Sequence, residues 1–159
     1  MEGIKIRAMR QGDIGPVYQV AQLSFSAPWN PPSFEYELNN RDAIIRVAVL
    51  NRKIAGYVCL RTILDVTHVM DLAVHPKLRR SGIGSMLLKS ALQQLRRTRQ
   101  DVRHVTLEVR ESNIAAIGLY EKFGFGEIGR RKEYYKKPPE DAVIMELDMD
   151  GTGFSFTVH

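Results

Sequence analysis

The sequence has one cysteine and no long apolar segment, and each of these scarcities excludes a class of protein. Cys59 is alone among 159 residues, so no internal disulfide can form, which fits a reducing cytoplasm. No segment approaches the run of about 20 apolar residues that a membrane-spanning helix needs. The first residues, MEGIKIRAMRQGD, contain no apolar h-region and no cleavage site of a secretory signal. We therefore expect a cytoplasmic protein that makes no membrane contact.

Metal-binding patterns are missing as well. The four histidines, at positions 68, 75, 104 and 159, show no spacing typical of metal ligands, and we predict no metal. For His68 we expect a structural or solvent-facing role. Cys59 lies in the strand-like run GYVCLRTIL, which favours a buried structural cysteine over a nucleophile.

What remains is the composition of one globular domain. Hydrophobic residues make up 44% and charged residues 26% of a chain that is long enough to bury a core. The net charge of +5 indicates attraction to anions. Nucleic acid, acidic protein surfaces and phosphorylated cofactors all qualify, and charge alone does not choose among them.

The hydrophobic pattern alternates between strand and helix periods and predicts one mixed α/β domain. Strands are expected at 4–9, 43–50, 54–64, 67–74, 101–110, 125–130 and 142–149. Helices are expected at 17–25, 33–39, from Gly82 onward, and at 114–123, where Asn113 can cap the start and Gly124 the end. The segment KKPPED reads as a loop between the two closing strands.

A pair of glycines marks the start of the longest predicted helix, in VHPKLRRSGIG. Glycine lets a backbone approach a ligand closely, and the free N–H groups at a helix start attract anions. A dinucleotide fingerprint would need glycine where Leu87 stands, and a Walker A loop would need lysine after Gly84, where Ser85 stands. The segment therefore predicts a pyrophosphate site that belongs to neither nucleotide motif.

This loop resembles the coenzyme A loop of the GNAT acetyltransferases, whose pattern is Gln/Arg-x-x-Gly-x-Gly/Ala. Arg79, Gly82 and Gly84 match the three defined positions. Three further segments, APWNPPSFEYEL, LEVRESNIAAIGLYEKFGF and EYYKKPPEDAVIMELDM, are similar to the ribosomal-protein alanine N-acetyltransferases of the RimI type. The resemblance covers roughly residues 4–149.

The resemblance implies a single GNAT domain at 1–149, followed by a tail at 150–159. The expected fold is a mixed sheet of about six or seven strands flanked by about four helices. Acetyl-CoA would be the acetyl donor. The residues implied to bind it are Leu72, Ala73 and Val74 for the pantetheine arm, Arg79, Arg80, Ser81, Gly82, Ile83, Gly84 and Ser85 for the pyrophosphate, and Asn113.

Two residues match the catalytic positions of the family. Glu108 would be the general base, and Tyr120 would protonate the departing thiolate. Proton transfer from a tyrosine of pKa near 10 to a thiolate of pKa near 8.5 is uphill by roughly 2 kcal/mol, which an enzymatic barrier accommodates. Outside the family context, Glu108 reads as a strand-surface carboxylate paired with Arg110 or Arg103.

The acceptor is expected to be the amine of a protein N-terminus. An α-amine has a pKa near 8 and a lysine near 10.4, so neutralising the α-amine at pH 7 costs about 3 kcal/mol less. By resemblance, Trp29, Phe34, Tyr134 and Tyr135 line the acceptor entrance, and the acceptor is the N-terminal alanine of a small-subunit ribosomal protein. Asp71 departs from the family, where a small neutral polar residue is more usual.

Other activities fit parts of the sequence. A GNAT enzyme could instead act on other N-termini, lysines or small amines. The basic segments KLRR, LRRTR and RRKEYYKK also suit an RNA- or ribosome-binding module. A degenerate acyl-CoA sensor is disfavoured by Glu108 and Tyr120. In the tail, apolar residues alternate with polar ones at 154–158, which predicts either a strand packed on a sheet or a disordered end.

Overall fold

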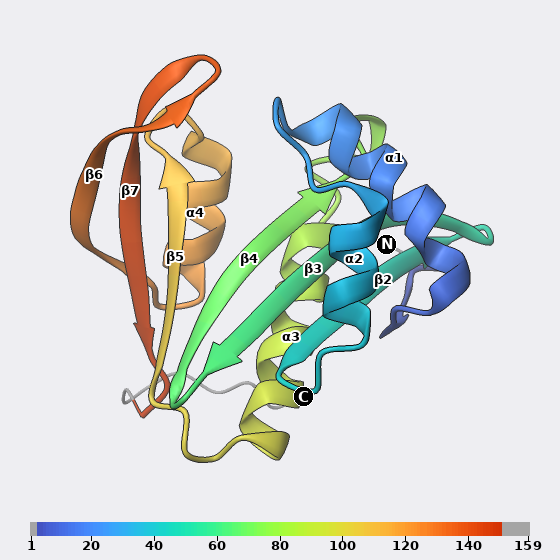
Figure 1. Cartoon of the computed structure of the whole chain (residues 1–159), viewed down its shortest axis with the longest axis horizontal. Coiled ribbons are helices and arrows are strands. Elements are labelled where there is room, and N and C mark those ends of the chain that lie inside the picture. Colours follow the sequence, from blue (N-terminus) through green and yellow to red (C-terminus); the bar gives the residue numbers. More distant parts are fainter. Residues whose placement is uncertain (1–2, 151–159) are drawn as a thin grey trace.

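The computed structural model describes residues 3–150, and its strands form one twisted sheet (Figure 1). The strand order is β1-β2-β3-β4-β5-β7-β6. The strands are β1 (Lys5–Ala8), β2 (Ala43–Leu50), β3 (Lys53–Ile63), β4 (Val66–Val74), β5 (His104–Arg110), β6 (Gly126–Lys136) and β7 (Pro139–Asp148). The helices are α1 (Ile14–Ser24), α2 (Pro31–Leu38), α3 (Ile83–Thr98) and α4 (Ile114–Lys122), with short 3-10 turns at Gln11–Asp13 and Pro76–Leu78. Within the described residues, these elements confirm the expected mixed sheet and its four flanking helices.

Helices cover both faces of the sheet, and each face has its own apolar cluster. On one face α3 buries the stripe that the sequence predicts, made up of Leu87, Leu88, Ala91, Leu92 and Leu95. The α4 residue Tyr120 joins the same cluster. On the other face α1 and α2 lie over β2 and β3 (Figure 1), where Val17 and Phe34 are fully buried against Tyr57.

The expected alternation along β5 is confirmed. Val105, Leu107 and Val109 are buried, whereas Thr106 and Glu108 face the other side and keep partial exposure. A strand with one buried face fixes which side chains can reach a ligand, because its period is two residues.

The closing hairpin differs from its prediction. Strand β6 extends to Lys136 and β7 begins at Pro139, so most of KKPPED is strand. Only Lys137 and Pro138 form a turn, in place of the loop that we expected. Prolines and charges are tolerated at the end of an edge hairpin, where few backbone N–H groups are needed. A register shift between Arg131 and Tyr135, with Glu133 at a φ of 49°, bulges β6 in this region.

Strands β4 and β5 pair only at their beginnings. The paired residues are 66–68 of β4 and 104–106 of β5, after which the two strands separate (Figure 1). A bulge helps to turn β4 away: Val69 pairs with Leu60 and Asp71 with Cys59, which leaves Met70 as the extra residue. We call the separated segments, residues 69–74 of β4 and 107–110 of β5, the fork.

Two further expectations concern the chain as a whole. No helix within residues 3–150 is both long enough and apolar enough to cross a membrane. Residues 151–159, nearly all of the predicted tail, lie outside the described residues, so the prediction of a packed or disordered tail stays a prediction.

Candidate active site

The fork leaves one edge of β4 without a strand partner. Leu72, Ala73 and Val74 pair with β3 on one side, and no strand within the described residues pairs with them on the other. Unpaired peptide groups of this kind bind an extended ligand in the way that a sheet edge binds an added strand. Arg79 already uses part of this edge, because its Nε donates to the Val74 carbonyl oxygen at 3.2 Å.

The loop after β4 ends in a left-handed glycine that opens α3. Gly82 is the N-cap residue with a φ of 85°, and a Cβ added to it would meet nothing within 4 Å. Arg80 also has a positive φ of 65°, and the Ser81 hydroxyl donates to the Leu78 carbonyl oxygen. Successive backbone N–H groups in a loop that includes left-handed residues can form a concave anion site.

The first turn of α3 has backbone N–H groups that are not used in the helix. Glycine has no side chain that could cap the helix, and among the described residues the N–H groups of Ile83, Gly84 and Ser85 have no acceptor. The first helical bond runs from the Met86 N–H to the Gly82 carbonyl oxygen at 3.1 Å. Free N–H groups at the positive end of a 16-residue helix suit a phosphate, so these residues fit the phosphates of coenzyme A.

The second glycine has a different role. A Cβ on Gly84 would lie 3.3 Å from Leu119 Cδ2, which is tighter than an ordinary contact. Gly84 therefore lets α3 and α4 approach closely, and it ties the loop to the helix that carries Tyr120.

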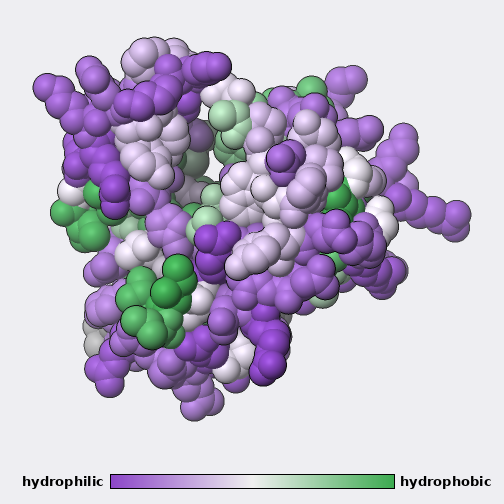
Figure 2. Space-filling model, viewed as in Figure 1, coloured by the Kyte–Doolittle hydropathy of each residue, from purple (hydrophilic) through white to green (hydrophobic). Residues whose placement is uncertain are grey.

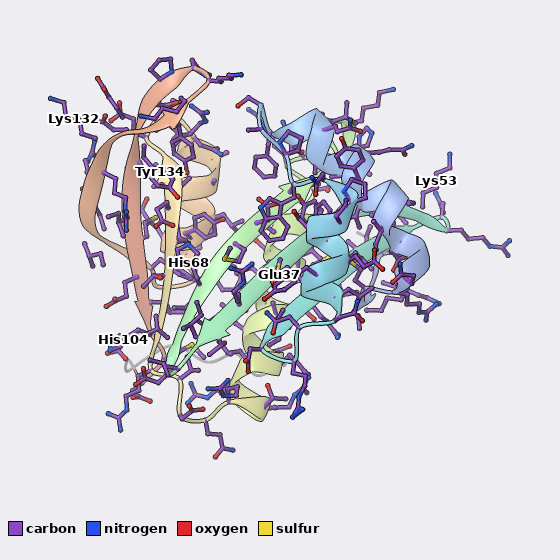
Figure 3. The ribbon with its side chains drawn as sticks, viewed as in Figure 1. Glu37, Lys53, His68, His104, Lys132 and Tyr134 are labelled. Atoms are coloured by element: carbon purple, nitrogen blue, oxygen red, sulfur yellow. The ribbon has the colours of Figure 1, made fainter. Side chains whose placement is uncertain are left out.

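Glu108 lies on β5 at the base of the fork and is held by a histidine. Its Oε2 lies 2.6 Å from His68 Nε2, and its side chain is 14% exposed. The other histidine nitrogen, Nδ1, lies 3.0 Å from the Thr106 hydroxyl. Arg131 Nε approaches the second carboxylate oxygen at 3.8 Å. Figure 3 shows His68 between the ribbons of β4 and β5, with Tyr134 on the same side of the sheet.

The alternative pairing of Glu108 with Arg110 or Arg103 does not form. Arg110 instead pairs with Glu140 at 3.2 Å, and Arg103 with Asp150 at 3.8 Å. His68, for which we expected a structural or solvent-facing role, contacts the candidate base directly.

Tyr120 lies on α4, buried against Phe125 with ring centroids 5.5 Å apart. Burial raises the pKa of the Tyr120 hydroxyl above its usual range, and the nearby Asp71 and Tyr135 raise it further. Tyr120 therefore keeps its proton at neutral pH. The same interactions place Asp71 and Tyr135, from β4 and β6, within electrostatic range of Tyr120.

The aromatic residues predicted at the acceptor entrance form two groups. On the side of α2, Trp29 contacts Phe34 at 5.4 Å and Phe34 contacts Tyr57 at 5.5 Å, centroid to centroid. Phe34 has no exposed surface, so it lies behind the half-buried Trp29. The surface is hollowed on this face between the β5–β7 part of the molecule and the α1–α2 part (Figure 2).

The second group is on the β6 bulge. Tyr134 and Tyr135 meet edge to face at 5.1 Å, and the Arg110 guanidinium lies 4.3 Å from the Tyr135 ring centroid. Burial, with the neighbouring Tyr134 and Glu108, raises the pKa of Tyr135 to about 12. Since the charge of Glu108 contributes to this shift, and Tyr135 in turn contributes to the shift of Tyr120, Tyr135 lies within electrostatic range of both candidate catalytic residues.

A second contact in the site was not foreseen. The Tyr57 hydroxyl donates to Asp71 Oδ2 at 2.8 Å, across the bulged pair of strands. Burial raises the pKa of Asp71 to about 6, although the Tyr57 hydrogen bond opposes this. The sequence shows that Asp71 is a lone aspartate in an apolar strand and departs from the family pattern. It does not show the hydrogen bond with Tyr57, because that contact depends on the bulge.

The remaining candidates have structural contacts. Asn113 caps α4 as expected, its side-chain oxygen accepting from the Ala116 N–H at 3.2 Å. Cys59 is fully buried, and burial raises its pKa above the usual range of a thiol. Within residues 3–150, no cluster of three histidine, cysteine or acidic side chains could hold a metal ion.

Comparison with known proteins identifies the family. The acetyltransferase (GNAT) family matches residues 14–125. A relative from Escherichia coli (strain K12), named [ribosomal protein bS18]-alanine N-acetyltransferase, is 33% identical over 144 residues, covering 89% of this chain and 95% of its own. A Bacillus subtilis (strain 168) relative, to which the same activity is assigned provisionally, is 38% identical over 141 residues, covering 88% and 92%.

A solved structure supports the same family. The crystal structure of the ribosomal-protein-S18-alanine N-acetyltransferase from Escherichia coli is 31% identical and superposes with a TM-score of 0.82, over 96% of this chain and 99% of that one. The chain therefore belongs to the GNAT family and is an N-acetyltransferase that takes its acetyl group from acetyl-CoA.

Proposed function

We propose that this enzyme acetylates the α-amino group of a protein N-terminus, namely the N-terminal alanine of ribosomal protein bS18, in the cytoplasm where ribosomes are assembled. The observation that supports this substrate is the match to the Escherichia coli enzyme named for this reaction, which spans 95% of that protein. The single cysteine is consistent with a reducing compartment.

The donor fits along the edge of β4 and the start of α3. The peptide groups of Leu72, Ala73 and Val74 would hold the pantetheine arm, and the residues from Arg79 to Ser85 would hold the pyrophosphate. The unpaired strand edge and the free N–H groups of the first turn support this placement. The amide nitrogen of Asn113 would add a donor, because its oxygen is already used by the helix cap.

The acceptor amine would reach the thioester through the fork. When the nitrogen–carbon bond forms and the carbon–sulfur bond breaks, the nitrogen loses a proton and the sulfur needs one. Glu108 would accept the nitrogen proton through a water molecule, and Tyr120 would give its hydroxyl proton to the sulfur. The raised pKa of Tyr120 makes this second transfer more uphill than for a free tyrosine, but it also guarantees that the proton is present.

The histidine contact would position the base. His68 holds one oxygen of Glu108 at 2.6 Å and is itself fixed by Thr106, so the carboxylate has one preferred orientation. Trp29 on one side, supported by Phe34, and Tyr134 with Tyr135 on the other would flank the incoming peptide.

Mass spectrometry tests the substrate. The enzyme is incubated with acetyl-CoA and a peptide that copies the N-terminus of bS18, with one lysine added near its end. We expect one acetyl group, located on the alanine α-amine. A matched peptide that begins with N-acetylalanine controls for lysine acetylation and should gain no mass. Acetylation of the lysine with the α-amine untouched would contradict the proposal.

A further inference from the structure

Asp71 is a half-buried carboxylate, and no cation among the described residues pairs with it. Its one hydrogen bond comes from the neutral hydroxyl of Tyr57, 2.8 Å away. Among the described residues it forms no ion pair, and no arginine, lysine or histidine lowers its pKa. A buried carboxylate is costly unless a positive group compensates it. The described residues therefore leave the charge of Asp71 without a cationic partner.

The position of Asp71 links the donor and acceptor sides of the fork. It immediately precedes Leu72, and both residues lie on the part of β4 that has no partner on the β5 side. Its charge reaches Tyr120 on α4, and its hydrogen-bond partner Tyr57 contacts Phe34 below the acceptor entrance. A group bound at Asp71 would thus lie close to both the candidate acid and the aromatic wall.

The groups around Asp71 on other elements do not supply the missing cation. From β3, Tyr57 and Cys59 face it, and both are neutral because burial raises their pKa values. From α4, Tyr120 is neutral for the same reason. The nearest cation on β3, Arg61, is committed to the buried carboxylate of Glu37, to which its Nε donates at 2.8 Å.

We propose that Asp71 binds the acceptor: its carboxylate is the counter-ion of the protonated α-amino group of the incoming chain. This inference rests on the proposed function, since an α-amine of pKa near 8 is mostly an ammonium ion at neutral pH. Asp71 holds that ammonium beside the donor. The ammonium loses two protons in all: Glu108 accepts the first through water before the nitrogen can attack and releases it to solvent, and it accepts the second as the nitrogen–carbon bond forms and Tyr120 protonates the sulfur. The two carboxylates of the fork thus have separate roles: Asp71 binds the ammonium, and Glu108 accepts its protons.

The inference is tested by comparing the binding of two peptides that differ only in the charge of the N-terminus. Two lysine-free peptides with the bS18 N-terminal sequence are used, one with a free α-amine and one N-acetylated. Calorimetry measures their dissociation constants with coenzyme A present, because coenzyme A carries no acetyl group and no reaction occurs. For the wild type we expect the free amine to bind at least about tenfold more tightly than the acetylated peptide.

Asp71→Asn should reduce this preference to about twofold or less, while binding of the acetylated peptide stays unchanged. Asp65→Asn, the same chemical change in the exposed turn between β3 and β4, should keep the wild-type preference. Asp71→Ser replaces the asparagine variant if thermal denaturation shows that the latter is unfolded.

An unchanged preference in a folded Asp71 variant would overturn the inference, as would a wild type with no preference. The proposed function is judged separately, by turnover of the free-amine peptide with acetyl-CoA. If the wild type acetylates that peptide and the variant keeps the preference, only the role of Asp71 fails. If the wild type does not acetylate the α-amine at all, the proposed function fails.

Discussion

The carboxyl group of Asp71 has a folded-state pKa of about 6, whereas its ordinary value is 3.8. Between these two values the folded chain binds more protons than the unfolded chain. Stability therefore falls as pH rises from about 4 to about 6, and it stays lower above that range. The cost at neutral pH is on the order of 3 kcal/mol, from a shift of about two units.

Asp71→Asn should for this reason stabilise the protein at pH 7.5, by about 1–3 kcal/mol, because the amide oxygen can still accept from Tyr57 and no charge is buried. At pH 4 the difference between variant and wild type should largely disappear. Urea denaturation of both proteins at the two pH values measures this. A variant that is less stable than the wild type at pH 7.5 would contradict the assignment of a buried, uncompensated charge.

Tyr120→Phe should separate catalysis from packing. Phenylalanine keeps the ring that contacts Phe125, so the melting temperature should change little. The acid is lost, so kcat should fall by about 100-fold while the dissociation constant of acetyl-CoA stays the same. Steady-state kinetics with calorimetry of acetyl-CoA checks both. A wild-type kcat would remove Tyr120 from the reaction.

At the scale of the elements, the two glycines before and within α3 serve different ends. Gly82 supplies a backbone conformation with a φ of 85° in open space, and Gly84 supplies a close helix contact at Leu119. Non-glycine residues pay roughly 1–2 kcal/mol for the left-handed conformation, and a crowded side chain costs about 1–3 kcal/mol of packing.

Gly82→Val and Gly84→Val should therefore have distinguishable effects. The first should weaken acetyl-CoA binding at least tenfold with a modest loss of stability, since its side chain meets only the ligand. The second should mainly lower the melting temperature, because it pushes α4 away from α3. Calorimetry and thermal denaturation on both variants measure this. Equal losses of affinity and stability in the two would contradict the separate roles.

The order and type of the elements could be predicted from the sequence because they depend on local patterns. The stripe on α3 and the alternation along β5 repeat every few residues. The cap by Asn113 joins residues that are only three positions apart in the sequence. The ends of the closing hairpin were missed, because a proline at an edge turn and a proline in a loop look alike in sequence.

The contacts inside the site could not be predicted in the same way. His68 reaches Glu108, and Tyr57 reaches Asp71, only because the strands pair in one register and β4 bulges at Met70. A one-residue slip would turn each of these side chains to the other face. The family resemblance named Glu108 and Tyr120, but it carried no information about the partners that surround them.

At the scale of the whole molecule, the net positive charge attracts the same ligand, acetyl-CoA, that the fork binds. The chain carries a net charge of +5, and Arg79 and Arg80 lie exposed beside the loop that fits the coenzyme A phosphates. Surface charges of this kind attract an anion over a distance that salt shortens, from about 10 Å at 0.1 M to about 3 Å at 1 M.

Acetyl-CoA should accordingly bind more weakly as salt rises, by several-fold between 50 mM and 500 mM KCl. The N-acetylated peptide, whose terminus is neutral, should respond less. Arg80→Ala should flatten the salt dependence for acetyl-CoA, whereas Lys53→Ala, at the exposed start of β3, should leave it unchanged (Figure 3 labels Lys53). Calorimetry over this range measures the effect. Salt-independent binding of acetyl-CoA would contradict an electrostatic role for the loop.

The central claim is that Glu108, held by His68 at the base of the fork, is the base that makes the α-amine reactive. The most direct measurement is the rate of α-amine acetylation of the bS18 peptide by Glu108→Gln and wild-type enzyme, followed by mass spectrometry with acetyl-CoA saturating. The account predicts a kcat at least about 100-fold lower in the variant, with acetyl-CoA affinity and melting temperature close to wild type. A variant rate within about threefold of the wild type would show that the nitrogen proton leaves by another route, and the account would be wrong.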